Sequence, residues 1–263
     1  MRPIASDANP TFRRWLKLAT QPRAVRESGR TLAEGIHLAQ AVLAANVRIE
    51  ALLARRGAKG AAAEALIDSV AQRGVPAFEL AAALFDRISP VEAGAGLMLE
   101  IAVPPPGPAP GIAEDLVYLD GIQDPGNAGA LLRVAAAAGV GWVLAAPGTV
   151  SLWAPRTLRA GQGAHFVLKL IEGAAAAGAA ERFDGNWIAA AAHDADPLWQ
   201  VRIPETPVGW VFGAEGRGIS EAMLARCDRR VRIPLAAGIE SLNVAAAAAV
   251  CLFERRRRIG AAK

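Results

Sequence analysis

Compact apolar runs alternate with alanine-rich stretches along most of this chain, and the alternation predicts strands and helices in turn. In the second half, the apolar runs predict buried strands at Leu116–Asp120, Trp142–Ala145, 187–191, Val208–Gly213 and 230–234. The stretches between them predict helices over 128–138, 173–182, 220–226 and 242–257. Apolar strands that alternate with helices form parallel sheets whose two faces are both covered. We therefore expect an α/β domain with a parallel sheet.

The first half follows the same alternation with shorter elements. Helices are expected over 12–19, 34–43 and 61–72, and strands over 30–33, 49–53 and 96–103. Prolines crowd residues 103–111 and exclude both a helix and a central strand, so this segment is expected to be a stiff, extended spacer. The chain therefore divides, by expectation, into a small α/β domain in residues 1–103, a proline-rich linker in 104–113 and a larger domain in 114–263.

Length and cysteine content narrow the class of protein. A chain of 263 residues is long enough for two domains. No apolar run reaches the roughly 18 residues of a membrane helix, and the first thirty residues lack the continuous apolar core of a secretory signal. The two cysteines, Cys227 and Cys251, have no CxxC spacing, which argues against a disulfide scaffold and a metal site. We expect a soluble, cytoplasmic protein with no metal ion and no membrane partner.

Basic residues gather at both ends of the chain, although the net charge is only +4. Seven of the first thirty residues are arginine or lysine, and four arginines follow one another at 255–258. Such clusters suit the phosphate backbone of a nucleic acid. A solvated helix face explains them equally well, so charge alone leaves both interpretations open.

Three segments are expected at the carboxyl ends of strands, where parallel α/β sheets bind ligands. The first runs from Asp124 through Pro-Gly to Asn127, with Arg133 about two turns into the next helix. An ordinary strand-to-helix connection explains the turn residues, but it does not explain the arginine. A long cationic side chain near such a loop suits a phosphate or a developing oxyanion.

The second segment runs from Gly213 to Gly218 and carries Glu215 in a turn whose glycines let the backbone approach a ligand. It matches neither G-x-G-x-x-G nor G-x-x-x-x-G-K-[ST], so nucleotide phosphate loops of those kinds lack support. Taken alone, a tight turn explains it, and Glu215 is a candidate functional carboxylate.

The third segment joins the end of a strand to the start of the last helix. Ser241 is expected to cap that helix, and Asn243 follows two residues later. Helix-start N–H groups beside an apolar rim of Ile233, Leu235 and Leu242 could hold a flat ring with polar edges. His165 follows the expected strand Trp142–Ala145. It could line the cleft, but a structural role is the simpler interpretation.

In this order, the three segments resemble the SpoU (TrmH-type) RNA 2′-O-ribose methyltransferases of the SPOUT superfamily. The resemblance covers residues 115 to about 254, including the segment 154–166. A looser similarity over 26–41 is to the small ribosomal-protein-like α/β domain that binds substrate in many members. The resemblance implies methyl transfer from S-adenosyl-L-methionine to a ribose 2′-hydroxyl of structured RNA, with rRNA favoured over tRNA.

The same resemblance implies a cofactor pocket of three C-terminal loops, one of them threaded through another as a deep trefoil knot. Family members are homodimers whose active site draws on both subunits. By position, the cofactor would contact Gly213, Ile233, Leu235 and Leu242, and the catalytic residues would be Asn127, Arg133, Glu215, Ser241 and Asn243.

The sequence departs from the family pattern at three positions. Ala214 stands where asparagine is common, and Ala245 and Gly161 stand where serine is usual. In the family proposal the arginine that Arg133 matches is the base, but a guanidinium stays protonated near neutral pH. We therefore expect Arg133 to stabilise the developing alkoxide or to hold the adjacent phosphate.

Other functions remain open from the sequence. A tRNA 2′-O-methyltransferase would use the same residues on another RNA. A non-catalytic RNA-binding or ribosome-assembly factor on the same fold would explain the basic termini, but it would not need Asn127, Arg133, Glu215 and Asn243. A Rossmann dinucleotide enzyme would need an early glycine fingerprint, which is absent.

Overall fold

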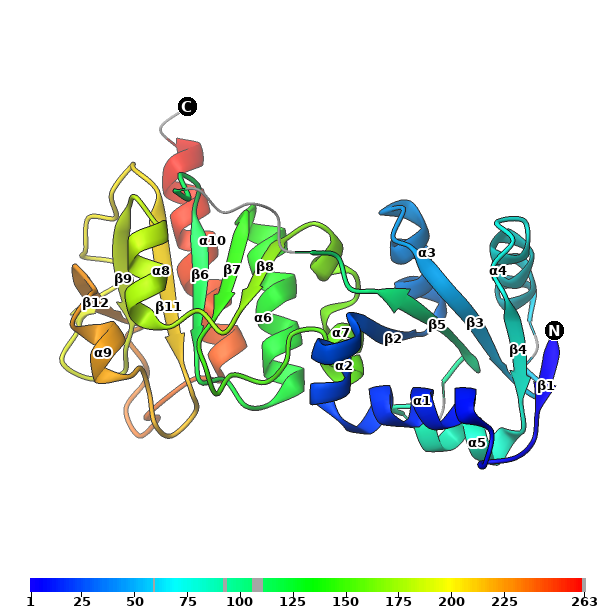
Figure 1. Cartoon of the computed structure of the whole chain (residues 1–263). Coiled ribbons are helices and arrows are strands. Elements are labelled where there is room, and N and C mark those ends of the chain that lie inside the picture. The colour runs from blue at the N-terminus through cyan, green and yellow to red at the C-terminus, as the bar shows by residue number, and fades with distance from the viewer. Residues whose placement is uncertain (59, 92–93, 106–110, 262–263) are drawn as a thin grey trace. The chain divides into compact units, whose positions relative to one another are not determined.

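The chain divides into two compact units in the computed structural model, which describes residues 1–58, 60–91, 94–105 and 111–261 (Figure 1). The first unit joins Met1–Pro105 with Trp153–Phe166, and the second joins Pro106–Leu152 with Val167–Lys263. Most of the expected spacer at 103–111 lies outside the described residues.

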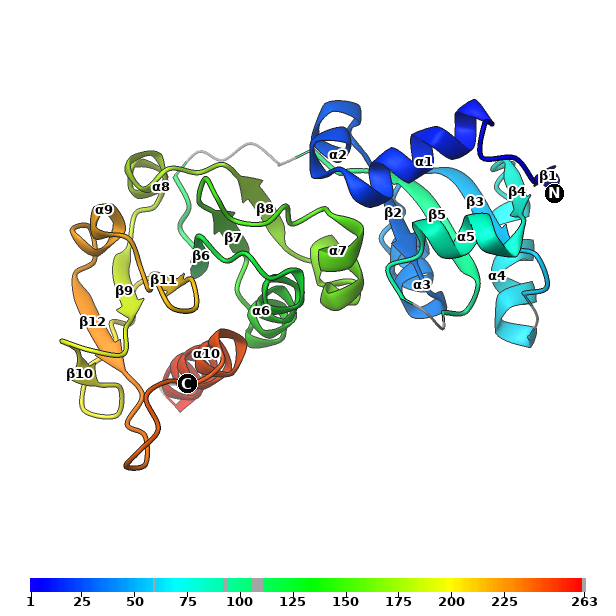
Figure 2. The ribbon, with the colours of Figure 1, turned by 90° about the horizontal axis from the view of Figure 1, so that it is seen from below.

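A five-stranded sheet in the order β1-β4-β3-β5-β2 forms the first unit. Its strands are β1 (Arg2–Ile4), β2 (Arg30–Glu34), β3 (Ile49–Arg55), β4 (Ala77–Leu80) and β5 (Leu97–Ala102). Helices α1 (Pro10–Thr20) and α5 (Ala82–Ile88) cover one face, and α3 (Ile36–Ala44) and α4 (Ala61–Ala71) cover the other, while α2 (Pro22–Ser28) follows α1 (Figures 1 and 2). The expected small α/β domain is confirmed, but β1, α2, β4 and α5 were not predicted from the sequence.

Helix α1 and its anchoring to the sheet follow directly from the sequence. Asn9 caps the helix by accepting hydrogen bonds from the next turn, and the buried Phe12, Trp15 and Leu18 recur on one face. The indole N–H of Trp15 donates to the buried carboxylate of Glu100 over 2.8 Å. Two arginines, Arg14 and Arg30, also bind that carboxylate, which satisfies a charge that would otherwise be costly to bury.

The second unit is a seven-stranded sheet in the order β10-β12-β9-β11-β6-β7-β8, and all its described pairs are parallel. The strands are β6 (Leu116–Asp120), β7 (Trp142–Ala145), β8 (Lys169–Glu172), β9 (Asn186–Ala190), β10 (Asp196–Pro197), β11 (Val208–Gly213) and β12 (Arg229–Arg232). The expected parallel α/β sheet is confirmed. Strands β8 and β10, at its two edges, were not predicted.

Helices cover both faces of this sheet. Helices α6 (Pro125–Ala138) and α10 (Val244–Ala261) pack together on one face, and α8 (Ala176–Arg182) and α9 (Glu221–Leu224) lie on the other (Figure 2). Side chains alternate along a strand, so Leu116 and Tyr118 of β6 join the core under α8 and α9, while Val117 and Leu119 are buried on the opposite side.

One segment between β7 and β8 belongs to the first unit rather than to the sheet that it leaves. It contains α7 (Pro155–Gly161) and the short 3-10 helix η1 (Ala164–Phe166), and α7 packs against β2. Thr31 donates a 2.6 Å hydrogen bond to the carbonyl of Trp153, and Arg159 reaches the carbonyl of Glu34. The edge strand β2 is thereby covered by residues more than a hundred positions later.

The arginine run at 255–258 serves mainly the structure of the second unit. Arg255 is 5% exposed, pairs with Asp115 at 3.1 Å and donates to the carbonyls of Pro204 and Thr206. Arg257 and Arg258 both pair with Glu254, and these bonds hold the pKa of that carboxyl down to about 2. Of the four arginines, Arg256 and Arg257 are exposed, and Arg257 is already paired with Glu254. A phosphate-binding patch would therefore have at most two of the four charges.

Candidate functional site

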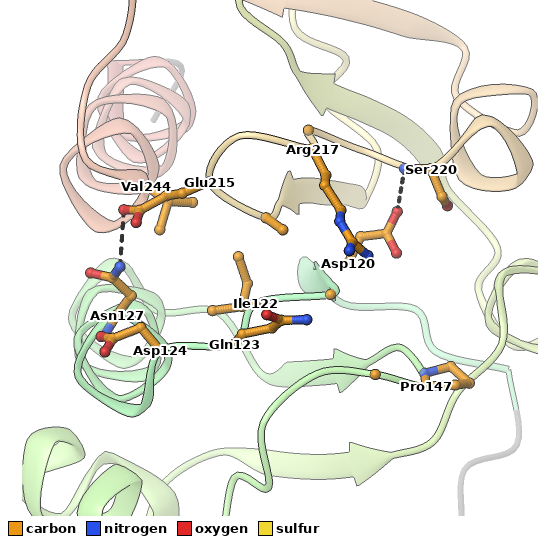
Figure 3. Close-up of a pocket in the computed structure, with 14 residues that line it drawn as sticks. Asp120, Ile122, Gln123, Asp124, Asn127, Pro147, Glu215, Arg217, Ser220 and Val244 are labelled. Atoms are coloured by element: carbon orange, nitrogen blue, oxygen red, sulfur yellow. Dashed lines mark hydrogen bonds between the residues drawn. The ribbon is translucent and has the colours of Figure 1, made fainter.

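A pocket of about 470 Å³ lies at the carboxyl edge of the parallel sheet, beyond the neighbouring strands β6 and β11 (Figure 3). The chain runs from β6 to β7 on one side, whereas β11, β9 and β12 lie on the other. Such a change of direction is where open α/β sheets bind ligands. The lining residues come from the end of β6, from the loops that follow β6, β7 and β11 and from the starts of α6 and α10: Asp120, Gly121, Ile122, Gln123, Asp124, Asn127, Pro147, Gly148, Ala214, Glu215, Arg217, Gly218, Ser220 and Val244.

Three polar side chains from the three predicted segments are joined by hydrogen bonds at this pocket. The side-chain amide of Asn127 donates to Oε1 of Glu215 over 2.9 Å. The amide of Asn243 donates to Oδ1 of Asn127 over 2.9 Å and to the same Glu215 oxygen over 3.2 Å. Segments separated by up to 116 positions thus meet in one network, and Figure 3 shows Asn127 directed toward Glu215.

Two helix starts hold this network in place. Asp124 accepts a 2.7 Å hydrogen bond from the backbone N–H of Asn127, and Pro125 occupies the first position of α6, a combination typical of a helix N-terminus. Asn243 does the same for α10, because its Oδ1 accepts from the N–H of Ala245 at 3.0 Å. The prediction that Ser241 caps the last helix is therefore wrong: α10 begins at Val244, two residues later than that cap requires.

The loop after β11 folds back onto Gly213. Ala214 and Gly218 form an isolated bridge, and a β-carbon on Gly213 would lie 2.2 Å from the backbone carbon of Gly218. Only a glycine fits there. This closed loop presents Glu215 and Arg217 to the pocket, and Ala214 forms part of the same lining.

The opposite wall is built around the end of β6. Oδ2 of Asp120 accepts a 2.7 Å hydrogen bond from the backbone N–H of Ser220. Thr149 accepts from the N–H of Gly121 and donates to the carbonyl of Leu119, which fixes the turn below the pocket. Figure 3 shows the side chains of Arg217 and Gln123 extending into the space beside Asp120.

Some of the residues expected at the site lie outside this lining. Arg133 is exposed on α6, and within the described chain it forms no hydrogen bond or ion pair. The helix turns about 100° per residue, so six residues place Arg133 about 240° around α6 from Asn127. Ser241 is exposed, and the four expected cofactor contacts, Gly213, Ile233, Leu235 and Leu242, are absent from the lining of the pocket.

The loop between β12 and α10 nevertheless has the properties of a site for an adenosine-like group. Ile233 and Leu235 are half-buried, and Leu242 is 38% exposed, so an apolar rim is available. Within residues 234–242, all of them described, Ile239 is the one residue whose backbone N–H donates to another residue. A flat ring with polar edges needs this combination of apolar side chains and open backbone donors.

The sequence interpretation missed the residues of the Asp120 wall. Asp120, Gln123 and Arg217 lie two to seven positions from predicted site residues, but no spacing rule separates them from ordinary turn residues. Pro147 and Gly148 come from the loop after β7, which carried no motif. The available signal was positional, since all of these residues lie at the end of a buried strand or within the next four positions.

Several other chemistries find no support in the described part of the chain. It contains no group of three or more His, Cys, Asp or Glu residues arranged to hold a metal ion, and none of its helices has the length and apolar character needed to cross a membrane. Burial raises the pKa of both the Cys227 and Cys251 thiols to about 12, so neither is a ready nucleophile.

Comparison with known proteins agrees with this geometry. A model of the SpoU rRNA Methylase family matches residues 115–253, and one of the MRM3-like substrate binding domain matches residues 9–98. The 23S rRNA (guanosine(2553)-2′-O)-methyltransferase RlmP of Bacillus subtilis (strain 168) is 28% identical over 258 residues, which are 97% of this chain and 100% of that protein.

Solved structures extend the likeness to the whole chain. A crystal structure of an RNA 2′-O ribose methyltransferase has a TM-score of 0.82 at 26% identity and covers 98% of this chain and 99% of its own. An AdoMet-bound rRNA methyltransferase from Sinorhizobium meliloti shares the fold, with a TM-score of 0.83, 24% identity and 98% coverage of both chains. Because the family model matches more than half of its residues, the chain belongs to the SpoU rRNA methylase family.

Proposed function

We propose that this protein transfers a methyl group from S-adenosyl-L-methionine to a ribose 2′-hydroxyl of ribosomal RNA. The observation that carries the proposal is the network of hydrogen bonds among Asn127, Glu215 and Asn243 at the pocket beyond β6 and β11. It brings together one residue from each of the three family segments. The full-length similarity to RlmP, named as a 23S rRNA enzyme, favours rRNA over tRNA as the substrate.

In this proposal the cofactor lies against the loop between β12 and α10. Ile233, Leu235 and Leu242 would contact its ring, and Gly213 would let the neighbouring loop close beside it. When bound, the cofactor supplies an electrophilic methyl group on a sulfonium. The protein then has to hold the 2′-hydroxyl in line with that group, and the network of Asn127, Glu215 and Asn243 fixes the loops that do so.

The active form is a homodimer in which the partner subunit's Arg133 completes the site. Two observations support this. Arg133 is exposed, lacks a partner among the described residues and lies on a different face of α6 from Asn127. Helix α10, which packs beside α6, exposes 47% of Phe253. A two-fold dimer would cover this apolar surface and bring an arginine from each chain to the other's pocket.

The role of Arg133 is to stabilise the alkoxide that develops on the ribose or to hold the adjacent phosphate. A guanidinium keeps its proton near neutral pH and presents a planar set of donors, so it suits an anion better than it suits proton removal. The proton then leaves to phosphate or water. Ser241 lies near Asn243 in sequence and would contact the bound RNA or cofactor.

Two further properties belong to the proposal. The loop between β12 and α10 would form part of a trefoil knot. The packing of α10 against α6 is consistent with such a path of the chain. The reaction would take place in the cytoplasm, where ribosomal RNA is assembled with proteins.

The test is incorporation of tritiated methyl groups from S-adenosyl-L-methionine into unmodified 16S and 23S rRNA transcripts, with bulk tRNA as a parallel substrate. Arg133→Ala should abolish transfer while cofactor binding, measured by calorimetry, is kept. Arg182→Ala, which removes an exposed arginine at the end of α8 in the same unit, is the matched control. If dimeric, cofactor-binding protein methylates none of these RNAs, the proposed methyltransferase activity is refuted. If it methylates tRNA alone, the substrate is tRNA rather than rRNA.

A further inference from the structure

The pocket beyond β6 and β11 contains two opposite charges that do not pair with each other. Asp120 and Arg217 both line it, yet no ion pair joins them among the described residues. Oδ2 of Asp120 is held by the N–H of Ser220 at 2.7 Å, and its Oδ1 accepts no hydrogen bond from the described chain. The guanidinium of Arg217 is likewise without a partner there, although Figure 3 shows it extending toward Asp120.

An acceptor and a donor that share a pocket without meeting leave room for a ligand that offers both. Gln123 adds an amide on the same side of the space, from the turn after β6 (Figure 3). The wall formed by Asn127 and Glu215 bounds the same cavity. The pocket therefore has a catalytic end and a second, polar end, which suits a nucleoside with its ribose at the first and its base at the second.

The charge pattern of the second end distinguishes among the four RNA bases. Guanine places two neighbouring donors, N1–H and the N2 amino group, beside the acceptor O6. A free carboxylate oxygen next to a guanidinium offers the complementary pattern, because one oxygen can accept from both neighbouring donors while the guanidinium donates to O6. Adenine and cytosine each have an acceptor where the carboxylate would need a donor, and uracil has a single N–H between two carbonyls. Enzymes that act on an unstacked nucleotide commonly read that edge with such groups.

We propose that Asp120 and Arg217 bind the base of the target nucleotide and select guanine. The proposal rests on the proposed methyltransferase function and adds its specificity. Asp120 accepts from N1–H and the N2 amino group through Oδ1, while Oδ2 stays on Ser220, and Arg217 donates to O6. Gln123 completes the rim of this base pocket.

Asp120→Asn is the sharpest variant, because the asparagine carbonyl can still accept from the N–H of Ser220 while its amide group replaces the acceptor that faces the base. We expect kcat/KM on rRNA to fall about tenfold to a hundredfold, the range for losing one bidentate base contact, with cofactor affinity within about twofold of wild type. Asp184→Asn, an exposed position before β9 with the same change of charge, should leave both unchanged. Arg217→Gln should lower kcat/KM, and Arg182→Gln should not.

Identifying the methylated nucleoside tests guanine selection separately from the proposed methyltransferase activity. After digestion of the labelled transcript, wild-type protein should place the label in 2′-O-methylguanosine. Label in another nucleoside would overturn the guanine assignment and leave the methyltransferase intact, whereas an absence of label from wild-type protein would defeat the function itself. Loss of cofactor binding in Asp120→Asn would show that this end of the pocket holds the cofactor, and would also overturn the proposal.

A second measurement couples the residue to the base. On a synthetic hairpin spanning the mapped site, inosine in place of the target guanosine removes only the N2 amino group. Wild-type protein should lose about tenfold in kcat/KM on inosine, and Asp120→Asn should lose much less, because the contact is already gone. Independent, multiplicative losses would contradict a direct contact between Asp120 and the base.

Discussion

The side-chain amide of Asn127 donates a 2.9 Å hydrogen bond to Oε1 of Glu215, 88 positions later in the chain. Because Asn243 donates to the same oxygen, the carboxylate accepts two amide hydrogen bonds and fixes the orientation of both asparagines. The loops that follow β6 and β11 and the start of α10 are joined by these bonds.

Replacing Asn127 with aspartate should therefore disrupt the site without changing its shape. The new carboxylate would lose the donor and face Glu215 with a like charge. We expect methyl transfer to fall by about a hundredfold, the order of magnitude for losing one active-site donor, when measured with labelled cofactor on rRNA. Asn186→Asp is the matched control, since Asn186 also donates through its amide, to Thr206 at 2.8 Å, but at the start of β9, at the amino end of the parallel strands and away from the pocket. Activity within twofold of wild type in Asn127→Asp would contradict a functional role for the network.

Mixed dimers should reveal whether Arg133 acts across the subunit boundary. A heterodimer of Arg133→Ala with Glu215→Ala contains one pocket in which Glu215 is intact and the other subunit's Arg133 is present. If the arginine acts in trans, this dimer should recover about half of the wild-type activity, although each homodimeric variant is inactive. If it acts within its own chain, both pockets are defective and no activity should return. Two affinity tags would isolate the heterodimer for the assay.

Gly161 leaves room for the ring of His165 within the first unit, so substitutions at the two positions should be energetically coupled. A β-carbon on Gly161 would lie 2.4 Å from the buried imidazole ring of His165, which itself packs against Trp153. Gly161→Ala should lower the free energy of unfolding by about 1–3 kcal/mol, as overpacking does. In the His165→Ala background the same substitution should cost much less, which a double-mutant cycle measured in urea would detect. Equal costs in the two backgrounds would mean that the ring moves aside freely.

The stabilising effect of Glu254 should depend on pH in a defined direction. Hydrogen bonds from Arg257 and Arg258 lower its pKa from 4.5 to about 2 in the folded protein. A carboxyl with a depressed pKa adds stability above its unfolded pKa and loses it as the pH falls toward the folded value. Glu254→Gln should therefore lower Tm at pH 7, and the difference from wild type should shrink between about pH 4.5 and 2. A constant difference across that window would assign the effect to packing.

Arg255 and Arg256 should behave differently although they are neighbours. Arg255→Ala leaves Asp115 without its partner and removes the donors to the carbonyls of Pro204 and Thr206, so it should destabilise the protein by about 3–5 kcal/mol. Arg256 is exposed, and its replacement should change the unfolding free energy by less than about 0.5 kcal/mol. Chemical denaturation of the two variants gives the comparison directly.

The sequence could predict the strands and helices near the site because their apolar patterns are long and regular. It could not predict the short strands β1, β4, β8 and β10, since two to four residues carry too little periodicity to stand out. Helix α10 illustrates a second limit. Ser241 is a good capping residue by type, but Asn243 takes that position because its amide also reaches Asn127 and Glu215, a contact invisible in local sequence.

The arginines show why charge alone was ambiguous. Arg133, Arg217 and Arg255 are the same residue type, yet one is exposed on a helix, one lines a pocket and one is 5% exposed among backbone carbonyls. Those environments arise from contacts between segments up to 140 positions apart. The family resemblance pointed to the loops after β6 and β11, and both line the pocket. The residues around Asp120 are identifiable only from the parallel pairing of β6 with β11, which places the ends of the two strands side by side.

A cut at the proline-rich segment would not separate the two units, because residues 153–166 of the first unit lie beyond it in the chain. A fragment ending at residue 105 would lack α7, leaving the edge strand β2 and the hydroxyl of Thr31 without their cover. The complementary fragment would carry α7 without its packing partner β2, so residues that are buried in the intact chain, such as Leu158, would become exposed. To exchange the first unit between relatives, both of its stretches, 1–105 and 153–166, would therefore have to be transferred together.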